Sequence, residues 1–110
     1  MISQRLIVAF LVTMFLVGCA TMKLPGQSGA NSILQRDASQ MVMLLESVED
    51  NTCKQSKIVN TEIVDYPKNP GKDPWTERWT VDRCGKLVYY RVGFTPSLGG
   101  GTDFGVHLWN

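Results

Sequence analysis

Residues 75–95 have the sequence WTERWTVDRCGKLVYYRVGFT, and this stretch predicts a hairpin at the centre of the fold. On each side of Cys84-Gly85 the residues fall into two alternating sets, one for each face of a β-strand, which is the pattern of two β-strands joined by a tight turn. In the first strand, one parity holds Trp75, Trp79 and Val81, and the other holds Thr76, Arg78, Thr80 and Asp82. In the second strand, Val88, Tyr90, Val92 and Phe94 alternate with Leu87, Tyr89 and Arg91. We therefore expect strands over 75–84 and 86–95.

One further strand is expected on each side of this hairpin. Residues 58–66 are rich in β-branched side chains, and residues 67–74 contain three prolines and Gly71, which predicts a strand followed by an exposed loop. After the hairpin, residues 96–102 contain Gly99-Gly100-Gly101 and predict a mobile connection. Phe104, Val106 and Leu108 then alternate through a short final strand.

A helix is expected to begin at Asn31 or Ser32 and to end near Asp50 and Asn51. Ser32 and Gln35 fit a capping box, and Asn tolerates the left-handed conformation that closes many helices. The spacing of four and three residues predicts an apolar stripe facing the core, formed by Leu34, Ala38, Met41, Leu45 and Val48. The residues expected on other faces are Gln35, Ser39, Glu46 and Glu49.

These elements predict an α+β domain with one N-terminal helix packed on a small antiparallel sheet of about four strands. The chain has three cysteines, and the N-terminal resemblance described below assigns lipid to Cys19. That resemblance leaves Cys53 and Cys84 as an even pair in an exported chain, so they are expected to form one disulfide, which would stabilise a small domain by roughly 3–4 kcal/mol. A redox or metal pair is the alternative, but the sequence has no CxxC spacing and one His. No metal or other cofactor is expected.

The N-terminus carries the most specific signal in the chain. A polar start with Arg5 precedes an apolar run from Leu6 to Val17, broken by Thr13, and Gly18-Cys19 follows. The 12 positions of the run would span roughly 18 Å as a helix, less than a bilayer core of about 30 Å. This segment resembles the signal peptide and lipobox of bacterial lipoproteins. The alternative is an ordinary secretory signal with a chance Cys.

The resemblance implies that cleavage occurs after Gly18 and that Cys19 carries lipid. Residues 1–18 are then the signal peptide, residues 19–30 a lipidated flexible tether, and residues 31–110 the domain. Ala20 follows the lipidated residue, and by resemblance to Gram-negative sorting this favours the periplasmic face of the outer membrane over that of the inner membrane. Removal of Arg5 leaves ten basic and ten acidic residues, so the mature chain is near neutral and nucleic-acid binding has no support.

The domain itself loosely resembles small Cys-containing domains of exported bacterial proteins of unknown function. The shared outline is a Cys after a helix, a Cys-Gly turn and an aromatic strand, here Cys53, Cys84-Gly85 and Tyr89-Tyr90. The resemblance implies no known active site.

The candidate catalytic residues have simpler interpretations. Glu77 and Asp82 lie on opposite faces by parity and are expected to be exposed strand charges. His107 has no recognisable partner residue and is expected at the surface, and Gly99–Gly101 lacks the strand–loop–helix context of a phosphate loop. No catalytic residue is therefore assigned. The domain has many aromatic residues for its size, so some of them are expected in the core, and those left exposed are candidates for a surface that binds a partner or a glycan. The aromatic residues are Trp75, Trp79, Tyr89, Tyr90 and Trp109, and the candidates for the partner surface are Trp75, Trp79, Tyr89 and Trp109.

The sequence thus predicts a non-enzymatic, lipid-anchored binding or structural module that contacts another envelope protein. A periplasmic lysozyme inhibitor is one alternative, because known members include small disulfide-containing lipoproteins rich in β-structure. An enzyme acting on the cell envelope is the other.

Overall fold

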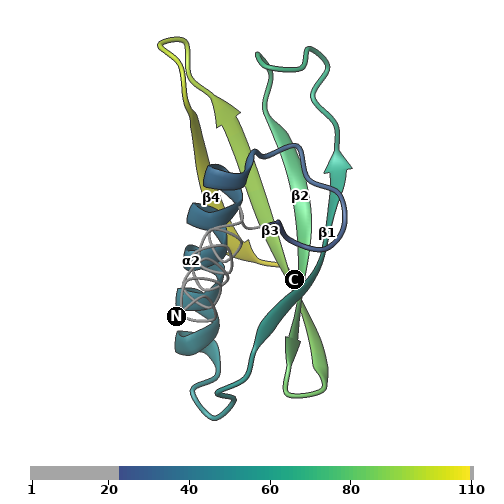
Figure 1. The fold of residues 1–110 in the computed structure, drawn as a ribbon, viewed down its shortest axis with the longest axis vertical. Coiled ribbons are helices and arrows are strands. Elements are labelled where there is room, and N and C mark those ends of the chain that lie inside the picture. The colour runs from purple at the N-terminus through teal and green to yellow at the C-terminus, as the bar shows by residue number, and fades with distance from the viewer. Residues whose placement is uncertain (1–22, 110) are drawn as a thin grey trace, which may run out of the picture.

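The computed structural model describes residues 23–109 and confirms the predicted α+β fold. Helix α2 (Ser32–Glu49) precedes four strands, β1 (Lys57–Asp65), β2 (Trp75–Arg83), β3 (Lys86–Pro96) and β4 (Thr102–Leu108). The strands form one antiparallel sheet in the order β1-β2-β3-β4, and α2 lies on one face of it, over the β4 side (Figure 1). The predicted cleavage and lipidation positions, Gly18 and Cys19, lie outside the described residues.

The central hairpin has the predicted register. Trp75 pairs with Phe94, and the pairing continues without interruption to Arg83 and Lys86. Cys84 and Gly85 form the turn with φ values of 50° and 95°, and the Gly85 N–H donates to Asp82 Oδ1 at 2.7 Å. The helix-facing side of the hairpin supplies most of the core, namely Trp75, Trp79, Val81, Tyr90, Val92 and Phe94.

Helix α2 is rotated away from the predicted orientation. Of the predicted apolar stripe, Ala38 is buried and Leu34 and Leu45 are partly buried, but Met41 and Val48 are exposed. The residues that α2 buries are Gln35, Ala38, Ser39, Val42 and Glu46. The stripe prediction was therefore wrong in part, because polar residues on the sheet-facing side have specific hydrogen-bond partners that a hydrophobic pattern does not show.

The ends of α2 also differ from the predicted motifs. Asn31 is the N-cap, and its Oδ1 accepts from the Leu34 N–H at 2.9 Å, so the expected Ser32 capping box does not form. Gln35 instead donates its amide to the Ala30 carbonyl at 2.8 Å. At the other end Asp50 is the C-cap in an extended conformation, so no left-handed Asn closes the helix.

The segment before the helix lies on the sheet, in contrast to the flexible tether predicted up to residue 30. Thr61 donates its N–H to the Pro25 carbonyl and accepts from the Gln27 N–H, both at 2.9 Å, so this segment adds a short parallel bridge to the outer edge of β1. Gly26 has φ +98°, and a Cβ there would collide with the Thr61 carbonyl oxygen. Residues 25–27 therefore cover part of one sheet edge.

The predicted disulfide is present between Cys53 and Cys84, whose Cα atoms are 5.9 Å apart. It joins the segment after α2 to the β2–β3 turn. The long apolar helix that a membrane span requires does not occur within residues 23–109.

Candidate functional site

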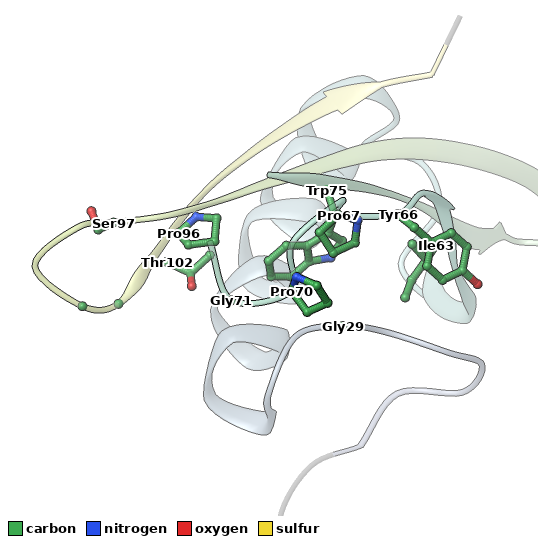
Figure 2. Close-up of a pocket in the computed structure, with 12 residues that line it drawn as sticks. Gly29, Ile63, Tyr66, Pro67, Pro70, Gly71, Trp75, Pro96, Ser97 and Thr102 are labelled. Atoms are coloured by element: carbon green, nitrogen blue, oxygen red, sulfur yellow. The ribbon is translucent and has the colours of Figure 1, made fainter. Parts of the chain in front are cut away.

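The β1–β2 and β3–β4 loops lie at the same end of the sheet (Figure 1), and residues from both loops line a pocket there (Figure 2). We call it the loop-end pocket. Its volume is about 500 Å³, within the range of roughly 300–1,000 Å³ that is typical of small-ligand sites. The lining residues that have a ring in the side chain are Tyr66, Pro67, Pro70, Trp75 and Pro96. Smaller residues complete the lining, namely Gly29, Ile63, Gly71, Ser97, Gly100, Gly101 and Thr102.

Trp75 is the fixed wall of this pocket. Its ring stacks on Phe94 with 4.8 Å between centroids, and its indole N–H donates to Glu77 at 2.7 Å. Gly29 lies against the same ring, and a Cβ added there would be 3.1 Å from the indole nitrogen. By contrast Tyr66 is 65% exposed at the start of the β1–β2 loop. The pocket therefore combines one rigid aromatic wall with a ring that is free to contact a ligand.

Glu77 is fully buried beneath this pocket, and the prediction of an exposed strand charge was wrong. Its Oε2 accepts from the Ser28 hydroxyl at 3.0 Å, the Gly29 N–H at 2.9 Å and Trp75 Nε1. Its Oε1 accepts from Trp79 Nε1 at 2.8 Å. These four uncharged donors satisfy the carboxylate and bind residues 28 and 29 to the sheet, so we assign Glu77 a structural role.

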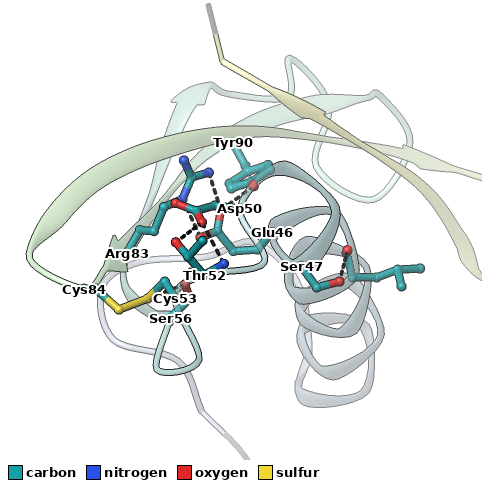
Figure 3. A network of polar contacts seen from close by, with 10 residues as sticks. Glu46, Ser47, Asp50, Thr52, Cys53, Ser56, Arg83, Cys84 and Tyr90 are labelled. Carbon is teal, nitrogen blue, oxygen red and sulfur yellow. Dashed lines mark hydrogen bonds and ion pairs between the residues drawn. A yellow bond between two sulfur atoms is a disulfide. The ribbon is translucent and has the colours of Figure 1, made fainter.

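A second buried carboxylate lies near the opposite end of the sheet, beside the disulfide (Figure 3). Arg83 donates two hydrogen bonds to Glu46, at 2.8 and 2.7 Å, and the Tyr90 hydroxyl donates a third at 2.7 Å. The Ser56 hydroxyl donates a fourth, at 2.8 Å. The hydrogen bonds from Arg83 hold the pKa of Glu46 at about 2 against the opposing effect of burial.

The same contacts shift the pKa values of Tyr90 and Arg83, two partners of Glu46. Burial, with the nearby Glu46 carboxylate, raises the pKa of Tyr90 above its ordinary value, and the hydrogen bond to Glu46 raises the pKa of Arg83. Tyr90 therefore remains protonated as a donor, and Arg83 remains charged. Because every polar group in this network has a partner, the network ties α2 to β2 and β3 and does not offer an acid or base to a substrate.

The structure does not bring the predicted partner-surface aromatics together. Trp79 is fully buried, so its assignment to a partner surface was wrong. Trp75 is 8% exposed and contributes a wall of the loop-end pocket rather than part of an exposed patch. Tyr89 and Trp109 are partly exposed, and each lies beneath an arginine. The Arg78 guanidinium carbon is 4.8 Å from the Tyr89 ring centroid, and that of Arg91 is 4.6 Å from the Trp109 centroid.

The other candidate residues lie apart from the loop-end pocket or serve turns. His107 is exposed on β4, as predicted, and Asp82 caps the β2–β3 turn. Gly100 and Gly101 have positive φ values in the β3–β4 connection. Within residues 23–109 no group of three His, Cys, Asp or Glu side chains could hold a metal ion.

Sequence reasoning missed the loop-end pocket because its walls come from separate segments. Residues 67–74 were expected to form an exposed loop, and residues 96–102 a mobile one. The spacing of prolines and aromatic residues at the ends of adjacent strands was the available signal. Comparisons with protein families, curated proteins and solved structures found no match for this chain.

Proposed function

We propose that this protein is a lipid-anchored, non-enzymatic binding module at the periplasmic face of the outer membrane. Its ligand would be an uncharged, extended peptide segment of another envelope protein, bound in the loop-end pocket. The resemblance of Leu16-Val17-Gly18-Cys19 to a lipobox supports the anchor, and the Cys53–Cys84 disulfide is typical of an exported protein.

One observation carries the choice of ligand. The rings of the pocket belong to Tyr66, Trp75 and three prolines, and its lining includes no carboxylate, imidazole, amine or guanidinium group. A charged ligand would lose its hydration there without gaining a counter-charge. Grooves lined by aromatic side chains bind extended, proline-containing peptides, because such segments lose little conformational entropy on binding.

The polar groups of the pocket agree with a peptide ligand. Hydroxyls of Ser97 and Thr102 are available at one wall, and they suit single hydrogen bonds to a peptide backbone. The Trp75 indole N–H is already bound to Glu77, so this ring offers a ligand apolar contact only. Both buried carboxylates are likewise satisfied by internal donors, which favours binding over acid–base catalysis.

Photocrosslinking in cells tests this proposal. A photoreactive residue replaces Tyr66 in the otherwise unchanged chain, and a matched control replaces Leu87, which is 53% exposed at the opposite end of the sheet. We expect a discrete protein adduct from position 66 and none from position 87, and its crosslinked peptide should be uncharged. Adducts of the same mass from both positions, or none from position 66, would contradict the proposal.

A further inference from the structure

The two edges of the sheet differ in how they are protected. The β1 edge carries two register irregularities, at 58–60 and 63–65, and residues 25–27 cover its middle. The β4 edge has a continuous register from Thr102 to Leu108, and it has neither Pro nor Lys. Among residues 23–109 no segment pairs with its outer side. A regular, unprotected edge of this kind is a template for another strand.

An exposed apolar surface of α2 lies on the sheet's β4 side. Four large side chains on α2 are exposed, Ile33 (61%), Met41 (41%), Leu44 (58%) and Val48 (76%), and we call them the α2 flank. At about 100° per residue they share one side of the helix, next to the partly buried Leu34 and Leu45. Below them, Phe104, Val106 and Leu108 of β4 point toward the helix layer and are only partly buried. Helix α2 lies beside β4, the strand with the open edge (Figure 1), and the α2 flank faces away from the side of the helix that the core covers.

We propose that this side of the domain binds a second copy of the chain, by antiparallel pairing of β4 with β4 about a two-fold axis. A lone peptide strand would satisfy the edge but would leave the α2 flank in water. A second copy supplies both layers, because a two-fold axis that pairs the strands also brings the two α2 flanks together. Such an isologous contact closes on itself and removes both open edges.

The sequence of β4 selects one register for this pairing. The Trp109 N–H donates to the Tyr89 carbonyl at 2.8 Å, so the alternation of an antiparallel ladder directs the backbone groups of 103, 105 and 107 toward β3. Those of 104, 106 and 108 then point outward. A two-fold axis at Gly105 pairs Phe104 with Val106 of the other copy on the helix side. It also places Asp103 opposite His107 of the other copy, which joins unlike side chains across the interface.

Cysteine crosslinking tests the axis directly. In this register the two Gly105 residues face each other as a non-hydrogen-bonded pair, at a Cα separation of about 4.5 Å that suits a disulfide. A Cβ at position 105 has no neighbour closer than His107 Nε2 at 3.7 Å, so Gly105→Cys is accommodated. Gly93→Cys is the matched control, because it lies beside Gly105 on β3 and its Cβ meets nothing within 4 Å.

The anchored, full-length variants are treated in membranes with a mild oxidant and separated on non-reducing gels. We expect Gly105→Cys to give a disulfide-linked dimer, with about tenfold less from Gly93→Cys. In the Gly105→Cys chain, adding Leu44→Glu should lower the dimer fraction about fivefold through charge burial, and Ser47→Glu, on an exposed position outside the α2 flank, should not. Equal crosslinking of both cysteines, adducts to a different protein, or no dimer from Gly105→Cys would overturn the proposal.

Discussion

The buried Glu46 network predicts a specific dependence of stability on pH, which the substitution Glu46→Gln exposes. Glu46 is 2% exposed and accepts hydrogen bonds from Arg83, Tyr90 and Ser56. Its pKa falls from 4.5 to about 2 in the folded chain, chiefly through Arg83. At about 1.4 kcal/mol for each pH unit, this difference contributes about 3 kcal/mol to the free energy of unfolding at neutral pH.

The sign follows from the direction of the pKa change. A carboxyl group whose folded pKa lies below its unfolded value stabilises the fold above the unfolded pKa, here 4.5. The stabilisation is lost as the pH falls from 4.5 through about 2. Since the amide introduced by Glu46→Gln does not titrate, the free energy of unfolding of the wild type should exceed that of this variant by about 3 kcal/mol at pH 7. The difference should fall to about half of that value at pH 3 and nearly vanish at pH 2.

Urea unfolding at a series of pH values measures this difference. Buried Trp75 and Trp79 make tryptophan fluorescence a suitable signal. Glu49→Gln is the matched control on the same helix, because Glu49 is exposed and no ion pair forms at it among the described residues. All other carboxyl groups are common to the wild type and Glu46→Gln, so their contributions to the free energy of unfolding cancel in the comparison. A difference between wild type and Glu46→Gln that stays constant from pH 7 to pH 3 would refute this reasoning.

Three further predictions concern the disulfide, Glu77 and the anchor. Cys53→Ser or Cys84→Ser should each lower the free energy of unfolding by roughly 3–4 kcal/mol, and the double variant by about the same amount, as measured by thermal unfolding. Glu77→Ala should lower the free energy of unfolding by roughly 3 kcal/mol and speed amide hydrogen exchange in residues 25–30, because four donors lose their acceptor. Unchanged exchange would contradict the role of Glu77 in binding residues 28 and 29 to the sheet. Cys19→Ser should abolish labelling with a palmitate analogue, and labelling at the wild-type level would remove the proposed anchor.

The strand pattern was predictable because successive side chains of a strand point to opposite faces of the sheet, so odd or even position alone assigns each residue to a face. Trp75, Trp79 and Val81 share one face of β2, as their parity predicts, and in the structure this face is turned toward the helix layer. The Cys84-Gly85 turn sets their register against β3. Glu77 has the same parity as Trp75, and parity alone would have placed it in the core. The rule that charged residues are rarely buried gave the opposite answer. It failed because two indole N–H groups, a hydroxyl and a backbone N–H converge on this carboxylate, and two of these donors lie nearly 50 residues away.

The same kind of long-range partner explains the rotation of α2. A turn of about 100° separates the predicted apolar stripe from the side that the helix buries. Rotating α2 to bury the stripe would withdraw Glu46 from Arg83, whose side chain is 14% exposed, and would leave that guanidinium without its counter-charge. It would also withdraw Gln35 from the Ala30 carbonyl at the start of the helix. The periodic pattern of a helix does not identify these partners, because Glu46 and Arg83 are 37 residues apart in the sequence.

The polar contacts of α2 therefore determine which apolar residues remain outside. With Glu46 and Gln35 fixed toward the sheet, Ala38 and Val42 fill the core, and Leu44 and Val48 remain exposed. Exposed side chains of this size on one helix side are uncommon in a small monomeric domain. If the α2 flank packs against a second copy, the Glu46 carboxylate keeps its hydrogen bonds and the apolar side chains of the flank are removed from water. The Glu46 network and the proposed dimer are then two consequences of one helix orientation, and Glu46→Gln should weaken Gly105→Cys crosslinking although position 46 lies outside the proposed interface.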